Sequence, residues 1–189
     1  MGEASKSFLT NVPPMGIYET LYAFQDAFGT YMGNKGTHPW SQGFPLTTQL
    51  PEGPEMPENI YVNAEDLKYP KAWGLPELRE AIADYYNHYY SAGIDQENIM
   101  VFAGGRPGLI ALLMFLQQDI HIRIAGTEYT PYYDMLRLLK REYSIVESHV
   151  DNSFFPTVQD YVNPVHGDRN LVMLSNPCNP TGVTRTGDE

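Results

Sequence analysis

The chain has 189 residues, and with 42% hydrophobic and 13% aromatic residues it can build a core and is not expected to be disordered. Its 12 lysines and arginines against 23 aspartates and glutamates give a formal net charge of −11, which argues against nucleic acid and anionic membranes as partners. The single cysteine, Cys178, excludes an intrachain disulfide and a cysteine-based metal site, and the five scattered histidines suggest no other metal site.

The N-terminal part of the chain carries no sign of export. Residues 1–7 lack the apolar core of a signal peptide, and the longest apolar run, residues 109–116, is too short to span a bilayer, so we expect a cytoplasmic protein. Prolines and glycines interrupt residues 1–60, where apolar spacing predicts one helix near residues 17–31. We interpret this segment as an N-terminal arm or part of a small domain, and residues 61–189 as the first part of a large domain.

From about residue 69 onward the pattern becomes regular. Some segments carry apolar residues at helical spacing, and shorter segments between them are typical of strands, such as the apolar run at 171–174. The expected elements are a helix over 75–89, a strand over 98–103, a helix over 106–117, a strand over 121–125, a helix over 131–142, and strands over 144–150 and 170–175. This alternation predicts a three-layer α/β fold, in which a mainly parallel sheet is flanked by helices.

The turn before the helix at 106–117 is rich in glycine. Gly104 and Gly105 would let backbone N–H groups approach an anion, and a helix N-terminus adds unpaired donors and a favourable dipole. Arg106 adds a fixed charge whose forked donors match a phosphate. These residues suit a phosphate cradle, and they equally suit an ordinary tight turn with a solvated arginine.

Two other loops follow expected strands. Tyr129 comes after the strand at 121–125, where an aromatic ring can stack on a flat ligand, although packing is the commoner role for a tyrosine. Residues 175–182 contain two Asn-Pro steps, and proline restricts both itself and the preceding residue, so this loop should be stiff and non-helical. Open α/β sheets bind ligands at this edge. Together, the three loops would form a pocket for a phosphorylated aromatic ring.

Two motifs carry a resemblance to a known family. The sequence Asn-Pro-Cys-Asn-Pro-Thr-Gly at 176–182 matches in full the Asn-Pro-x-Asn-Pro-Thr-Gly signature of the class I/II aminotransferases, which are fold-type I pyridoxal-phosphate enzymes. The segment from Tyr69 to Arg79 matches their Tyr-x-x-x-x-Gly-x-x-x-Leu-Arg entry into the large domain. With a Gly-x-Pro segment at 43–45, the chain resembles this family over about residues 43–182.

The resemblance implies roles for the three loops. Gly104, Gly105 and Arg106 would hold the phosphate of pyridoxal 5′-phosphate. Tyr129 would stack on the pyridine ring of this cofactor. Asn179 would hydrogen-bond the ring oxygen and favour its ionised form.

Two further residues would act outside these loops. Tyr69 would reach the cofactor phosphate of the partner subunit in a homodimer, and Gly43 would lie close to the substrate. The chain departs from residues common in the family at Ala103, Glu128 and Thr130, which leaves the subgroup open.

The resemblance also implies a missing catalytic group. The family's Schiff-base lysine follows the Asn-Pro-Thr-Gly loop at a distance, so we expect it beyond Glu189. The implied activity is transfer of an amino group from an amino acid to a 2-oxo acid by a truncated, cleaved or split protein, completed by a C-terminal fragment. The 189 residues alone would then be inactive. A pyridoxal-phosphate-dependent lyase, decarboxylase or oxidase on the same fold is one alternative, and a non-catalytic fragment or assembly partner is another.

Overall fold

The computed structural model describes residues 16–41, 43, 51–162 and 169–187. Contacts divide the chain into two compact units, residues 1–61 and 62–189. Within the described ranges, no helix is both long and apolar enough to cross a membrane. The same ranges contain no group of three or more histidine, cysteine, aspartate or glutamate side chains placed to hold a metal ion.

The helix of the first unit is α1, Gly16–Phe28. It ends before residue 31, the predicted limit, because Gly29 adopts a φ of +68° while its N–H still donates to the Gln25 carbonyl at 2.8 Å. The rings of Phe24 and Phe28, one turn apart, lie 4.7 Å from each other between centroids.

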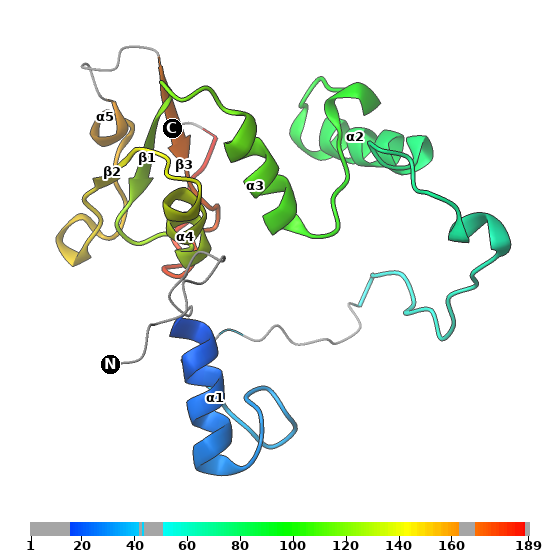
Figure 1. Cartoon of the computed structure of the whole chain (residues 1–189), viewed down its shortest axis with the longest axis horizontal. Coiled ribbons are helices and arrows are strands. Elements are labelled where there is room, and N and C mark those ends of the chain that lie inside the picture. Colours follow the sequence, from blue (N-terminus) through cyan, green and yellow to red (C-terminus); the bar gives the residue numbers. More distant parts are fainter. Residues whose placement is uncertain (1–15, 42, 44–50, 163–168, 188–189) are drawn as a thin grey trace, which may run out of the picture. The chain divides into compact units, whose positions relative to one another are not determined.

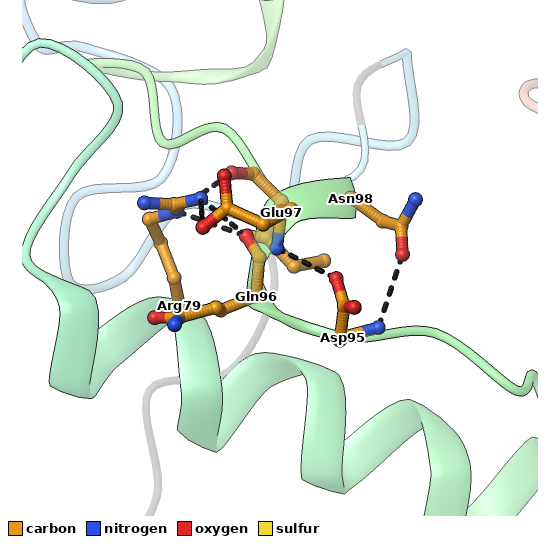
Figure 2. A network of polar contacts seen from close by, with 6 residues as sticks. Arg79, Asp95, Gln96, Glu97 and Asn98 are labelled. Atoms are coloured by element: carbon orange, nitrogen blue, oxygen red, sulfur yellow. Dashed lines mark hydrogen bonds and ion pairs between the residues drawn. The ribbon is translucent and has the colours of Figure 1, made fainter.

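The second unit begins with η1 (Ala64–Leu67) and α2 (Pro76–Tyr90), the helix expected over 75–89. The apolar stripe that predicts α2 is largely exposed, whereas Arg79 is buried. As Figure 2 shows, Arg79 extends toward η2 (Gln96–Asn98), where it donates to the Gln96 carbonyl at 2.6 Å and contacts Glu97 at 3.1 Å. A guanidinium that satisfies several acceptors thus joins α2 to the next segment.

The strand predicted over 98–103 is absent from the described structure, so this prediction was wrong. Ile99 has an extended backbone, and the Val101 N–H donates to the Trp73 carbonyl at 3.0 Å. That bond reaches a loop, whereas a strand requires a ladder of bonds to a neighbouring strand. The apolar run indicates an extended segment, and it carries no information on whether another strand lies beside it.

The remaining elements form a parallel sheet with helices (Figure 1). β1 (His121–Ala125) is the central strand, between β2 (Tyr143–Val146) and β3 (Asn170–Met173), in the order β2-β1-β3. Both pairs are parallel, which confirms the prediction. β1 has its predicted bounds, while β2 and β3 are shorter than the predicted strands at 144–150 and 170–175.

The core lies where α3 (Gly105–Phe115) and α4 (Thr130–Leu138) pack on one face of the sheet. Its buried members are Leu113, Ile122, Ile124, Met135, Leu136 and Met173. Because side chains alternate along a strand, Ala125 belongs to the other face, in a small cluster with Val146 and Tyr161 of α5 (Val158–Tyr161). Helices therefore cover both faces, as a three-layer α/β fold requires.

The connection from α4 to β2 also closes the end of α3. α4 ends before the predicted residue 142, because Lys140 takes a φ of +53° and the Arg141 N–H donates to the Leu136 carbonyl at 2.9 Å. The buried Arg141 guanidinium donates to the carbonyls of Leu116 and Gln117 at 3.0 and 2.7 Å. Leu116 is the C-cap residue of α3 and Gln117 follows it, so Arg141 binds the chain at the end of α3 from a distant part of the sequence.

Candidate active site

Three loops lie together at the carboxyl edge of the sheet. Residues 126–129 leave β1 and residues 174–182 leave β3, so the parallel strands deliver both loops to one edge. The turn that begins α3 reaches the first of them through Arg106. Positions far apart in sequence thus come into contact at a place where α/β sheets bind ligands.

The glycine turn starts α3 without a side-chain cap from any described residue. Gly104 has a φ of +102° and a ψ of 158°, a conformation that favours glycine, and the helix begins at Gly105. A Cβ atom built on Gly108 would lie 2.9 Å from the ring of Phe102, so this third glycine allows the close approach of that ring. The Gly104 N–H donates to the Phe102 carbonyl at 2.8 Å, so the donors of this helix N-terminus begin at Gly105.

Arg106 connects the glycine turn to Tyr129. Its Nε donates to the Tyr129 hydroxyl at 3.0 Å, and its Cζ lies 5.8 Å from the centroid of that ring. Tyr129 is half-buried and immediately precedes α4, where Tyr132 meets it edge-to-face at 5.3 Å. The guanidinium and the aromatic ring that sequence reasoning assigned to one ligand are therefore neighbours in the fold.

Glu128 connects the loop after β1 to the loop after β3. Its side chain is buried, with the residue 4% exposed. The Ser175 N–H lies 3.1 Å from each carboxylate oxygen, and the Ser175 hydroxyl donates to Oε2 at 2.7 Å. The same Ser175 Oγ accepts the Asn179 N–H at 2.9 Å. A chain of hydrogen bonds thus runs from Glu128 to the backbone of Asn179.

The Asn-Pro loop is held at both ends by its own polar groups. The Asn176 side chain donates to the Arg185 carbonyl at 3.0 Å and accepts the Arg185 N–H at 2.8 Å. Cys178 bonds through its N–H to the Val183 carbonyl at 2.8 Å, and its Sγ lies 3.2 Å from the Thr127 carbonyl oxygen. Both Asn-Pro peptide bonds are cis. Asn179 is exposed, and its side-chain amide has no hydrogen-bond partner among the described residues.

Two other predicted site residues are not part of these three loops. Tyr69 belongs to the second unit and is fully exposed. Gly43 belongs to the first unit, and its neighbours Gln42, Phe44 and Pro45 lie outside the described residues. The described lysines, at positions 35, 68, 71 and 140, are all exposed.

Sequence reasoning missed the contribution of Glu128 and Ser175. Glu128 was recognisable only as an unusual residue beside the aromatic Tyr129, and an acidic residue in a loop is ordinarily solvated. Its burial depends on Ser175, which follows a strand formed about fifty residues later in the chain. Nothing in the local sequence signals such a pair.

Two tyrosines near the site are expected to make the folded state less stable at alkaline pH. Burial raises the pKa of Tyr132, with help from the Glu128 carboxylate, and burial also raises the pKa of Tyr133 above its usual value of 10.0. A raised pKa in the folded state means that this stabilisation is complete below pH 10 and is lost as the pH rises through the folded-state pKa. We expect the free energy of unfolding, measured in urea, to fall above about pH 10 and to fall less steeply in Tyr132→Phe.

Comparisons with known proteins identify the family of the chain. A family model described as aminotransferase class I and II matches residues 37–189. The chain belongs to this family. An aspartate aminotransferase of Pyrococcus horikoshii is 26% identical over 112 residues, covering 59% of this chain and 29% of that protein. Transaminase BacF of Bacillus subtilis is 28% identical over 144 residues, covering 75% of this chain and 36% of BacF.

Solved aminotransferase structures have the same fold as the matched part of this chain. The aspartate aminotransferase of Thermus thermophilus with maleate aligns with a TM-score of 0.57 and 25% identity, over 64% of this chain and 32% of that chain. Substrate-bound BacF of Bacillus subtilis aligns with a TM-score of 0.57 and 26% identity, over 66% and 32%. The chain thus spans about a third of the length of the relatives that it matches.

Proposed function

We propose that this chain is part of a pyridoxal-phosphate-dependent aminotransferase, which transfers an amino group from an amino acid to a 2-oxo acid. The observation that supports this most directly is the hydrogen bond from Arg106 to Tyr129, because it joins a phosphate-type turn to an aromatic ring. Glu128, next to Tyr129, extends the same cluster to the Asn-Pro loop. The donors and the ring are those that a phosphorylated pyridine would need.

In this proposal each loop has one task toward the cofactor. Gly104 shapes the phosphate turn, with its own N–H donating to the Phe102 carbonyl at 2.8 Å. The N–H of Gly105 and the guanidinium of Arg106 hold the phosphate, as a helix N-terminus and a forked cation can. Tyr129 lies against the pyridine ring, and the free amide of Asn179 bonds the ring oxygen. The bound cofactor supplies the electron sink for the reaction, while these residues orient it.

The proposal also concerns the rest of the protein. The described lysines are exposed, and the chain spans about a third of its relatives' length. We propose that a segment outside residues 1–189, on the same chain or on a complementing one, supplies the catalytic lysine. Tyr69 would serve the cofactor of a partner subunit in a homodimer, and Gly43 would lie near the substrate. Residues 1–189 alone would bind the cofactor reversibly without turnover.

The activity is tested on the protein that also contains the sequence encoded after Glu189, or on residues 1–189 mixed with a separate chain encoded nearby. With an amino-acid donor and a 2-oxo acid acceptor, we expect a new 2-oxo acid to form in stoichiometric amounts with the new amino acid, in a pyridoxal-phosphate-dependent manner. Residues 1–189 alone should form none. Release of ammonia or a cleaved side chain without an acceptor would instead support a lyase, decarboxylase or oxidase.

A further inference from the structure

The starting observation is a buried acid without a charged partner. Glu128 is 4% exposed, and no described lysine or arginine forms an ion pair with it. A carboxylate removed from water is tolerated when hydrogen-bond donors replace its hydration. The donors here are the Ser175 N–H and hydroxyl, together with the Tyr129 N–H at 3.2 Å. Glu128 therefore connects the loop after β1 to the loop after β3.

The hydrogen bonds of Ser175 fix the orientation of its hydroxyl group. An ionised carboxylate can only accept, so the Ser175 hydroxyl proton must point toward Glu128. The oxygen of that hydroxyl is then left with its lone pairs for the N–H of Asn179, 2.9 Å away. Through Ser175, the acid thus helps to fix the backbone of Asn179.

We propose that Glu128 is a positioning residue for Asn179, acting through Ser175. This inference rests on the proposed function, because it assigns Asn179 to the ring oxygen of pyridoxal 5′-phosphate. The hydrogen bond holds the backbone N–H of Asn179, and the exposed side-chain amide then projects from a fixed point of the loop. A rigid starting point lowers the conformational cost of binding a ligand.

The first experiment examines the chain without ligand. Glutamine in place of Glu128 keeps the shape but leaves one acceptor oxygen for several donors. We expect hydrogen exchange of the Asn179 N–H, followed by NMR, to become at least about tenfold faster in Glu128→Gln and in Ser175→Ala, as the loss of one charge-assisted hydrogen bond implies. Glu142→Gln, a matched change at an exposed position, should leave this exchange rate unaltered. Unchanged exchange in Glu128→Gln would overturn the inference.

The second experiment measures the affinity for pyridoxal 5′-phosphate and, by competition, for inorganic phosphate. We expect Glu128→Gln to weaken the affinity for pyridoxal 5′-phosphate several-fold. The affinity for inorganic phosphate should stay unchanged, because the phosphate turn does not depend on Asn179. In Asn179→Ala, adding Glu128→Gln should cause a smaller loss of affinity than it causes in the unaltered chain, because only its bond to the Tyr129 N–H can then matter. A merely structural role would give additive losses and would weaken both ligands.

The two experiments separate the inference from the proposed function. If the unaltered chain binds no pyridoxal 5′-phosphate, the proposed function fails, while the exchange measurement still decides whether Glu128 fixes Asn179. If the unaltered chain binds the cofactor and Glu128→Gln binds it equally well, the proposed function stands and the positioning role is wrong.

Discussion

Replacement of Arg106 by alanine is expected to weaken binding of pyridoxal 5′-phosphate to this chain by about 10- to 100-fold, the effect of losing hydrogen bonds between a guanidinium and a phosphate. Arg106 is exposed at the first turn of α3 and is the arginine that contacts Tyr129. The dissociation constant can be measured from the change in cofactor absorbance or in tyrosine fluorescence. Arg106→Lys should recover only part of the affinity, because lysine keeps the charge and lacks the forked geometry.

The matched control for this variant is Arg137→Ala. Arg137 is an exposed arginine on α4 that pairs with Asp134 at 2.6 Å, so its loss removes the same charge from another surface. We expect its affinity for the cofactor to equal that of the unaltered chain. The affinity for pyridoxal, which lacks the phosphate, should be the same in both variants as in the unaltered chain. If Arg106→Ala and the unaltered chain bind pyridoxal 5′-phosphate equally well, the proposal that this turn binds the phosphate is wrong.

Replacement of Leu136 by alanine is expected to lower the free energy of unfolding by about 2–5 kcal/mol, the range for a fully buried leucine. Leu136 is 0% exposed and packs in the cluster that contains Ile122 and Ile124 of β1. The loss combines the transfer of apolar atoms to water with the cavity that the core cannot fully close. Urea denaturation, followed by circular dichroism, gives this value.

Leu138 offers the control on the same helix. It is 48% exposed, so Leu138→Ala makes the same chemical change where little apolar surface is buried. We expect a loss below about 1 kcal/mol, as is usual for surface positions. Similar losses for the two variants would mean that α4 does not pack on the sheet through Leu136.

Much of the α/β pattern could be read from local sequence. β1 has the sequence His-Ile-Arg-Ile-Ala, in which polar and apolar residues alternate before Ala125, and the structure places it at its predicted residues. The helices before and after it were predicted from apolar spacing and differ only at their ends. Those ends depend on details such as the positive φ of Gly29 and of Lys140, the second of which is unusual for a residue with a side chain.

The segment at 98–103 shows where local reasoning stops. Its composition is that of a strand, yet in the described structure it pairs with no other strand, and the Val101 N–H bonds to the Trp73 carbonyl instead. Strand formation depends on a partner that lies elsewhere in the chain. In the same way, the spacing along α2 predicts a helix correctly and does not predict that Arg79 is buried there.

Part of the candidate site could likewise be predicted from the sequence, and part could not. The Gly104–Arg106 turn, Tyr129 and the Asn-Pro loop are visible in sequence, because unusual backbone requirements restrict which residues can occupy such positions. The contact of Arg106 with Tyr129 and the bond from Ser175 to Glu128 join residues 23 and 47 positions apart. The second contact exists only after the parallel strands β1 and β3 bring their carboxyl ends together, and the first only after α3 packs against the sheet. Residue identity thus indicated which chemical groups a site could use, and tertiary structure decided which of them meet.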